Sequence, residues 1–381
     1  FLSAALSSDM DDSDRVRLLL DDCKNFEIDI LKPDVNKSQL NFVNQGDNEI
    51  LYGLGAVKGL GKAAIENIIS EREQKPFENL YDFCARVDLS KVDKRGIEPL
   101  IKCGAMDSFN LSRKEMLESL EDAMKYAKQN TMTQESGISD LFGGISESND
   151  FIPVRKDKYD DFANSKFEFS ALGFYLETHP VKEHYWELKK LGTGSIENVM
   201  EERVNTISGV IIRQNRIQTR RGPLVFATLD DGTDRIELVI SSEVLDSFEG
   251  NLNPQTIYIA SGDVTFEKDT QKKNIGLQKK MRVTDIKSLE EARMKSVTKL
   301  KINIEGQEKK DVLDIVENLK AIALIENNTQ GSQIEMQYNL NSGSANIELD
   351  KDFRILLNDD NMDKLVENCG KENIDFQYRA R

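Results

Sequence analysis

The sequence has very few of the residues on which metal sites, disulfide frameworks and catalytic triads depend. Among its 381 residues there are only 2 histidines and 4 cysteines. The cysteines are Cys23, Cys84, Cys103 and Cys369. They lie far apart without a CxxC pair, which argues against zinc and is typical of unpaired thiols in a reducing cytosol. His179 and His184 have no third ligand nearby, so we expect neither a metal site nor a catalytic triad.

Long apolar runs are also missing. No stretch approaches the roughly 18 apolar residues of a membrane-spanning helix, so we expect no membrane partner and a cytoplasmic location. The first residues, FLSAALSSDMDDSD, contain neither an initiator methionine nor the basic and apolar segments of a signal peptide. They indicate a piece of a longer chain, and the length predicts about two to four domains.

The sequence has fewer positively charged than negatively charged residues. The chain has 51 Lys and Arg against 67 Asp and Glu, which gives a net charge of -16. This excess of negative charge opposes unselective binding to polyanions such as nucleic acids. Any contact with a nucleic acid must therefore come from local groups of basic residues.

The segment patterns predict a multidomain α+β fold. Residues 1–50 combine a helix around DRVRLLLDDCKNF with short strands. Residues 51–110 have helical spacing, with Ile50, Leu54 and Val57 on one face, and this predicts two short helices joined by a glycine turn. Within residues 111–200, Ser112 and Glu115 form a capping-box pattern before an amphipathic helix, and a polar linker follows.

Residues 201–290 change to strand patterns. Five strands punctuated by RRGP, DDGT and KDTQKKN, with a helical segment after the third strand, predict an OB-fold β-barrel. Residues 291–381 follow the order β-α-β-β-α-β, which predicts a small α+β domain.

The stretch GLGAVKGLGKAAI, residues 53–65, has the glycines and lysines of a phosphate-binding loop. A Walker A loop would need a glycine at Ala56 and a hydroxyl at Ala63. A dinucleotide fingerprint would need a glycine at Lys58 and a preceding strand. Both interpretations fail at required positions, so nucleotide binding is disfavoured.

A helix-hairpin-helix fits the same stretch better. Gly59 and Gly61 would permit a tight turn, Leu60 would point into the core, and the N–H groups that begin the next helix would face a phosphate. Lys58 and Lys62 flank the turn with positive charge. The alternative is an ordinary turn between two helices that binds nothing.

The predicted barrel is rich in arginine. Its first hairpin carries Arg213, Arg216, Arg220 and Arg221. OB folds bind single strands through such basic grooves, with bases stacked on aromatic rings. Phe226 and Phe266 are candidate platforms, and packing in the core is an equal alternative for both. A solvated charged hairpin is the alternative for the arginines.

The polar linker contains one apolar pair, Leu141 and Phe142, within SDLFGG. Such a pair in a flexible segment is typical of a short peptide that anchors to a partner protein. Packing of the pair against its own domain is an equally weighted alternative.

Four stretches carry a resemblance to a known family. They are LSSDMDDSDRVRLLLDDCKNFEIDILKPDVNKS, YGLGAVKGLGKAAIENIISERE, FENLYDFCARVDLSKVDKRGIEPLIKCGAMDSF and FEFSALGFYLETHPV. Throughout its length and in the order of its domains, the chain resembles the C-terminal part of the bacterial replicative C-family DNA polymerases, the alpha subunits of DNA polymerase III.

The resemblance implies a role for each segment. Residues 1–50 would end the fingers domain, residues 51–110 would bind double-stranded primer-template DNA through the hairpin, and the barrel at 201–290 would bind single-stranded template. Residues 111–200 would carry the peptide that docks on the sliding clamp (beta subunit), and residues 291–381 would bind the clamp-loader tau subunit. The family's clamp motif, Gln-x-x-Leu/Met-Phe, falls on Ile138, Ser139, Asp140, Leu141 and Phe142, with Ile138 where glutamine is usual.

By the same resemblance, the catalytic palm with its metal-binding aspartates and magnesium lies upstream of Phe1. No PDxDxD-like run occurs in the chain. We therefore expect no catalytic residues, no cofactor and no DNA synthesis from these residues alone, although the full-length protein would be a DNA-directed DNA polymerase. The alternative is a separate nucleic-acid-binding or repair protein that combines a hairpin with an OB barrel.

Overall fold

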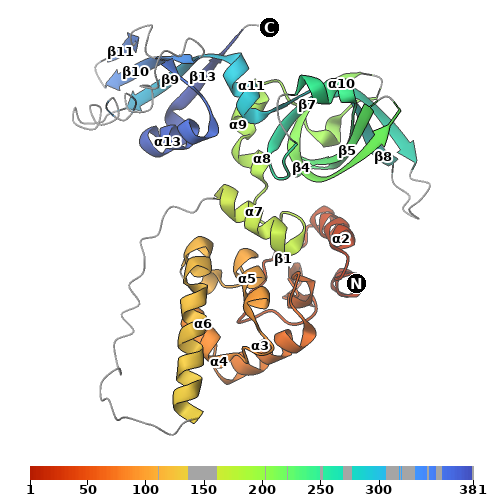
Figure 1. Cartoon of the computed structure of the whole chain (residues 1–381), viewed down its shortest axis with the longest axis vertical. Coiled ribbons are helices and arrows are strands. Elements are labelled where there is room, and N and C mark those ends of the chain that lie inside the picture. The colour runs from red at the N-terminus through yellow and green to blue at the C-terminus, as the bar shows by residue number, and fades with distance from the viewer. Residues whose placement is uncertain are drawn as a thin grey trace. The chain divides into compact units, whose positions relative to one another are not determined.

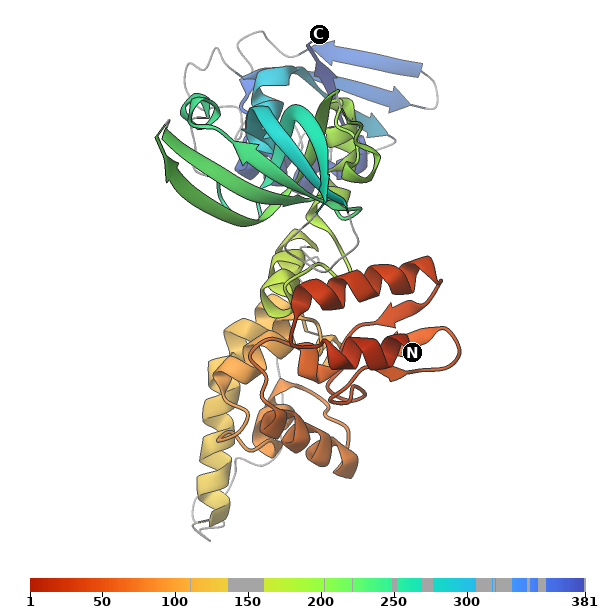
Figure 2. The ribbon, with the colours of Figure 1, turned by 90° about the vertical axis from the view of Figure 1, so that its right-hand side faces the viewer.

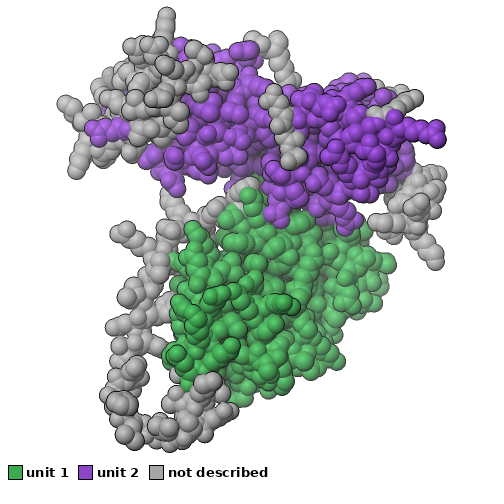
Figure 3. All heavy atoms as spheres, viewed as in Figure 1, with its two compact units in different colours: residues 1–180 green, residues 181–381 purple. Residues whose placement is uncertain are grey.

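A computed structural model describes residues 1–109, 111–135, 161–201, 203–220, 222–248, 252–268, 277–305, 317, 319, 331–340, 343–348 and 354–379. The chain divides into two compact units, unit 1 (Phe1–Pro180) and unit 2 (Val181–Arg381) (Figure 3). Among the described residues, unit 1 encloses one hydrophobic core and unit 2 encloses two. No helix in these ranges is long and apolar enough to cross a membrane.

Unit 1 is mostly helical (Figure 1). Its helices are α1 Leu2–Ser8, α2 Ser13–Asn25, α3 Lys62–Gln74, α4 Leu80–Arg86, α5 Lys94–Lys102, α6 Arg113–Glu135 and α7 Asp161–Leu172, with 3-10 turns η1 Leu54–Ala56 and η2 Asp107–Phe109. Three short strands, β1 Asp29–Leu31, β2 Val43–Asn44 and β3 Glu49–Leu51, form a sheet in the order β1-β3-β2. Helices α1 and α2 lie beside each other, and α2 is next to β1 (Figure 2).

The helix predicted over residues 50–57 is wrong. Ile50 belongs to β3, and Leu54 begins the single turn η1. Ile50, Leu54 and Val57 are all buried, so their spacing reflects burial in a strand and a turn rather than one face of a helix. Close backbone contact enforces this path, because a Cβ on Gly53 would lie 2.6 Å from the backbone of Asn41.

The helix predicted after Ser112 is confirmed as α6. The Ser112 N–H donates to Glu115 Oε2 at 2.8 Å, and the Glu115 N–H donates to Ser112 Oγ at 3.2 Å. This reciprocal pair is the capping box that the spacing predicts. The apolar positions of the helix, Met116, Leu120, Ala123 and Ala127, are all buried.

Unit 2 contains the predicted OB barrel. After α8 Pro180–Glu183, α9 Tyr185–Lys190 and η3 Ile196–Asn198 come β4 Val204–Thr219, β5 Gly222–Asp230, β6 Arg235–Ile240, α10 Ser242–Ser247, β7 Ile257–Lys268 and β8 Leu277–Ser288. The five strands close in the order β4-β5-β6-β8-β7 (Figure 1). Burial alternates along β6, where Ile236, Leu238 and Ile240 point into the core, so the period of two in the sequence is confirmed as one inward and one outward face.

The rest of unit 2 is an α+β sheet domain. It contains α11 Leu289–Ser296, β9 Val297–Glu305, β10 Ser332–Leu340, β11 Gly343–Glu348, β12 Arg354–Ile355, α13 Asp359–Cys369, η4 Lys371–Asn373 and β13 Ile374–Tyr378. The sheet order is β11-β10-β9-β13, with β12 paired to β10. The predicted strands and the last helix are confirmed, whereas the helix predicted at 310–325 falls almost wholly outside the described residues. Helix α11 was not predicted.

A buried ion cluster ties three helices of unit 2 together. The side chain of Arg293 on α11 is almost fully buried, and its guanidinium lies 2.6 Å from Glu187 on α9 and 3.0 Å from Asp359 on α13. Glu187 is also fully buried. Removing one partner would leave an uncompensated buried charge, which is strongly unfavourable.

Candidate nucleic-acid interface

The glycine stretch forms a tight turn into helix α3. Gly59 has a φ of +82°, in the left-handed region that glycine adopts without strain. Gly61 is the N-cap of α3, and a Cβ built on it would have nothing within 4 Å. The turn is therefore restricted to glycine by backbone conformation at Gly59, and it is open to an approaching ligand at Gly61.

Leu60 points into the core between the two glycines, as predicted. Its side chain is only 8% exposed, and its Cδ1 lies 3.4 Å from the position that a Cβ on Gly96 would occupy. Gly96 belongs to α5. Leu60 thus packs against α5, so the turn that precedes α3 rests on α5.

The start of α3 presents unused hydrogen-bond donors. The Gly61 carbonyl accepts the N–H groups of Ala64 and Ile65 at 3.0 and 3.1 Å. Within the described part of the chain, the N–H groups of Lys62 and Ala63 have no acceptor, and both residues are exposed. Free N–H groups at a helix start, together with the positive end of the helix dipole, form an anion-binding site.

Three basic residues have main-chain atoms at or near this turn, but their side chains are not equivalent. The Lys62 side chain is 72% exposed and lies 3.8 Å from Glu66, a surface pair that contributes little. The Lys58 N–H donates to the Ala171 carbonyl at the end of α7, and its ammonium lies in the space left by Gly173. Lys58 therefore also supports the end of α7.

The third cation, Arg95, was missed by the sequence analysis. It is exposed, and its carbonyl oxygen lies 3.6 Å from the position that a Cβ on Gly59 would occupy. Nothing in the glycine stretch points to it. Its main chain reaches the turn because α5 packs against Leu60.

On the barrel, one row of side chains crosses three strands. Phe226 on β5 lies opposite Asn215 on β4 and Val239 on β6. Its neighbours Val225 and Ala227 are buried inside the barrel, and side chains alternate along a strand. Asn215, Phe226 and Val239 therefore share the outer face.

The two predicted platforms differ. Phe266 packs against the barrel core. Phe226 is partly exposed and, among the described residues, takes no part in that core. A partly exposed ring on the outer face of an OB barrel can stack on a base.

Arginine flanks the row at both ends. Arg213 lies opposite Thr228, two positions along from Phe226, and so shares its face. Arg282 on β8 lies opposite Val239 and is exposed. Arg282 was missed, although the alternation of Lys280 and Arg282 with the buried Met281 could have placed it outward.

The remaining predicted cations lie elsewhere. Arg216 is opposite the inward-facing Val225, so it occupies the other face of the hairpin. Arg220 is exposed in the turn, and Arg221 lies outside the described residues. Lys280, which was not among the predicted residues, is balanced by Glu267 and Glu237, at 2.8 and 3.5 Å.

Comparison with known proteins identifies both modules. Residues 27–116 match the helix-hairpin-helix motif, and residues 206–289 match the OB-fold nucleic acid binding domain. Over 388 residues the chain is 29% identical to DNA polymerase III subunit alpha of Pasteurella multocida, a match that covers 100% of this chain and 33% of the relative. The chain is homologous to the DNA polymerase III alpha subunit. This confirms the resemblance carried by the four quoted stretches.

A second alpha subunit, from Vibrio cholerae, is 31% identical over 389 residues, with 99% of this chain and 32% of the relative covered. The chain thus spans about a third of the length of these alpha subunits. Among solved structures, the second OB-fold domain of replication protein A from Methanococcus maripaludis matches 26% of this chain and 94% of its own, at 19% identity and a TM-score of 0.20. The alpha-subunit homology and the two matched modules support a DNA-binding region.

Two further predictions concern the clamp-binding peptide and metal ions. Residues 138–142, the predicted clamp-binding peptide, lie outside the described residues, so the assignment stays a prediction. In the ranges that are described, no group of three or more His, Cys, Asp and Glu side chains is arranged to hold a metal ion.

Proposed function

We propose that this chain is the DNA- and partner-binding part of a replicative polymerase alpha subunit. In it, the hairpin of unit 1 holds duplex primer-template DNA and the barrel of unit 2 binds single-stranded template. One observation carries the proposal. This homologue of a polymerase subunit combines a helix start with exposed N–H groups in unit 1 and an outward-facing aromatic row, flanked by arginines, in unit 2.

The hairpin suits duplex DNA of any sequence. Its donors are the main-chain N–H groups of Lys62 and Ala63, and the exposed Lys62 side chain adds positive charge. Such groups contact phosphates, which position a protein on the duplex without reading bases. A replicative enzyme has to hold every sequence equally well.

The barrel face suits a single strand. Phe226 offers a stacking surface, and stacking of a base on an aromatic ring contributes about 1–3 kcal/mol. Asn215 beside it supplies hydrogen bonds to a base edge, and Arg213 and Arg282 lie where the phosphates on either side would pass. Because every base has a stacking face, this arrangement also tolerates any sequence.

Homology supports the rest of the proposal. The full-length protein would carry out DNA-templated DNA synthesis at a palm that holds magnesium, and the present residues would not. Residues 138–142 would dock on the sliding clamp, and residues 291–381 would bind the clamp-loader tau subunit.

The DNA assignment is tested by binding this chain to a labelled duplex and a labelled single strand. Phe226→Ala should weaken single-strand affinity by about 5- to 150-fold, equivalent to 1–3 kcal/mol, and leave duplex affinity unchanged. Tyr185→Ala, which removes another exposed aromatic ring of unit 2, is the matched control. Equal single-strand affinity for wild type and Phe226→Ala would contradict the barrel assignment.

The clamp assignment has its own test. Leu141→Ala with Phe142→Ala should abolish capture by purified sliding clamp. Leu141→Met should retain it, because methionine satisfies the same position of the motif. If the double variant is still captured, the anchor lies elsewhere in the chain.

A further inference from the structure

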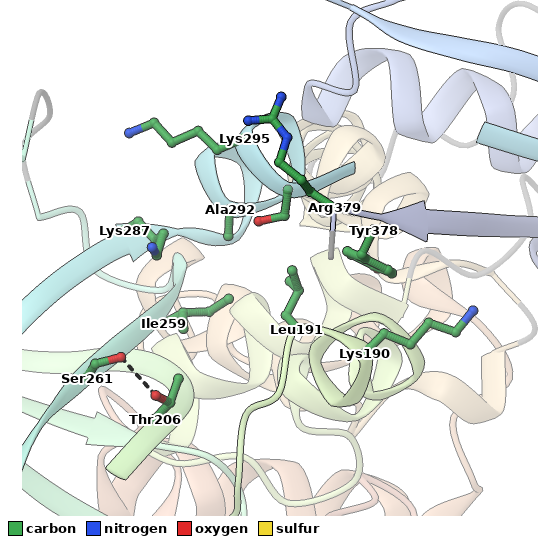
Figure 4. A pocket seen from close by; sticks show the side chains of 11 residues that line it. Lys190, Leu191, Thr206, Ile259, Ser261, Lys287, Ala292, Lys295, Tyr378 and Arg379 are labelled. Carbon is green, nitrogen blue, oxygen red and sulfur yellow. Dashed lines mark hydrogen bonds between the residues drawn. The ribbon is translucent and has the colours of Figure 1, made fainter. Parts of the chain in front are cut away.

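Unit 2 contains a pocket of about 620 Å³ where the barrel meets the C-terminal sheet domain. Its walls come from β4, β7 and β8 of the barrel, from α9 and α11, and from the end of β13 (Figure 4). The Phe226 row uses other segments of the barrel, so the pocket is a separate feature from the proposed single-strand surface.

The barrel side of the pocket is polar at its base. Thr206 Oγ1 and Ser261 Oγ are 2.9 Å apart (Figure 4). Both residues belong to the outward-facing set, because their chain neighbours Ile207 and Ala260 point into the core. Ile259 on the same outer face is only 3% exposed, since α11 packs over β7. The pocket is therefore a covered part of the barrel's outside.

The residues that line the pocket carry a net positive charge, whereas the whole chain has a net negative charge. Of the eleven described residues that line the pocket, four are Lys or Arg and none is Asp or Glu, although acidic residues outnumber basic ones 67 to 51 in the whole sequence. A concave site lined by one sign of charge concentrates ions of the opposite sign.

The four cations are not equally available. Lys190 pairs with Asp375. Lys287 lies 2.9 Å from Asp285. Lys295 and Arg379 are exposed and form no ion pair with any described residue. These two side chains are the uncompensated charges of the pocket.

We propose that this pocket binds the phosphate of a nucleotide. Lys295 and Arg379 would hold the phosphate, and arginine in particular matches its geometry with two parallel donors. The hydroxyls of Thr206 and Ser261 would bond to the sugar or the phosphate, and Leu191, Ile259 and Ala292 form an apolar wall for the base. The volume lies within the range of roughly 300–1,000 Å³ typical of small-molecule sites.

The nucleotide could be free or part of a strand, and calorimetric titration of this chain distinguishes the two. The probes are thymidine monophosphate, an oligothymidylate and a glutamate-rich peptide without phosphate. Binding of the mononucleotide identifies a free-nucleotide site. If the mononucleotide does not bind, oligonucleotide binding that remains in Phe226→Ala and is weakened further when the pocket variant is added to it identifies a second single-strand contact.

The pocket variant is Lys295→Ala with Arg379→Ala, and it should weaken nucleotide binding at least tenfold. The matched control is Lys189→Ala with Lys364→Ala, which removes the same charge from exposed positions outside the pocket and should not change affinity. Unchanged fluorescence of Trp186, the lone tryptophan, verifies that unit 2 is folded in both. The proposal is overturned if neither nucleotide probe binds, if the two double variants behave alike, or if the peptide binds as well as the nucleotides.

Discussion

The two units offer nucleic acids different chemistry. In unit 1 the contact groups belong to the main chain, because the exposed N–H groups of Lys62 and Ala63 follow a glycine that leaves them open. In unit 2 they belong to side chains, because Phe226 and its row stand on the outer face of a closed barrel. A site built from main-chain groups depends on the path of the backbone. A site built from side chains can be removed by truncating one side chain while the backbone stays intact.

The units also differ in their buried ionisable groups. In unit 1, Glu168 on α7 is 1% exposed, and burial raises its pKa to about 7 although the N–H groups of Leu176 and Glu177 donate to it. In unit 2, burial and the nearby Arg293 lower the pKa of His184 to about 4. Burial therefore favours the protonated form of Glu168 and the neutral form of His184.

The largest expected effect comes from the ion cluster of unit 2. Arg293→Ala should destabilise unit 2 by about 3–5 kcal/mol, because it leaves Glu187 charged and buried without its partner. Urea unfolding followed by Trp186 fluorescence measures this, since Trp186 belongs to unit 2. Amide hydrogen exchange in unit 1 should stay unchanged, and a matching loss of protection there would contradict the division into two units.

The contributions of Glu168 and His184 to the pH dependence of stability should have opposite signs. Folded Glu168 keeps its proton up to a pH of about 7, whereas the unfolded chain loses it near the ordinary value of 4.5. Unit 1 should therefore lose up to about 3 kcal/mol as the pH rises from 4.5 to 7. Hydrogen exchange at pH 5 and pH 8, corrected for the intrinsic rates, measures the difference.

Glu168→Gln is the matched variant, because it retains an acceptor for the two N–H groups and cannot titrate. It should abolish this part of the pH dependence of unit 1. For His184 the unfolded chain takes up the proton first, so unit 2 should lose stability as the pH falls from about 6.5 to 4. A pH profile of unit 1 that Glu168→Gln leaves unaltered would contradict the assignment to Glu168.

Much of the barrel could be predicted from sequence, but the hairpin could be predicted only in part. Strand alternation depends on local burial, so β4 to β8 follow from the period of two. The helix predicted over Ile50 to Val57 was wrong because the buried positions of a short strand and a turn happened to repeat at helical spacing. Gly59 and Gly61 were found, since turn chemistry is local.

The features that could not be predicted from the sequence depend on packing between residues that are far apart in the chain. The main chain of Arg95 reaches the glycine turn through the contact of Leu60 with α5, and Arg282 reaches the Phe226 row through the parallel pairing of β6 with β8. The raised pKa of Glu168 likewise depends on tertiary burial, which the residue type alone does not reveal. Arg213 and Arg216 were grouped by proximity in sequence, and strand geometry places them on opposite faces.

Gly61→Ser should separate helix stability from DNA binding at the hairpin. Serine is a better N-cap than glycine by a few tenths of a kcal/mol, because its hydroxyl accepts an N–H of the first turn. The same hydroxyl would occupy the donor that a phosphate needs. We therefore expect unchanged or slightly raised stability of unit 1 together with duplex affinity reduced by about tenfold, roughly 1.4 kcal/mol.

Fluorescence anisotropy with duplex and single-stranded DNA measures this effect. Single-strand affinity should be unaffected, because the substitution lies in unit 1. If Gly61→Ser binds duplex as tightly as wild type, the main-chain donors of α3 do not contact phosphate, and the hairpin is an ordinary turn.

The smallest expected effect concerns individual arginines of unit 2, and it reports the path of the strand. For a single strand, removing one cation that neutralises a phosphate reduces the slope of log affinity against log salt by about 0.7. Arg282→Ala should show this reduction for single-stranded DNA and leave the duplex slope unchanged. Arg216→Ala is the matched control, because it removes an exposed arginine from the opposite face of the hairpin. A reduced slope for Arg216→Ala and an unaltered one for Arg282→Ala would place the strand on that other face, away from Phe226, and the contrast between a main-chain site in unit 1 and an aromatic site in unit 2 would fail.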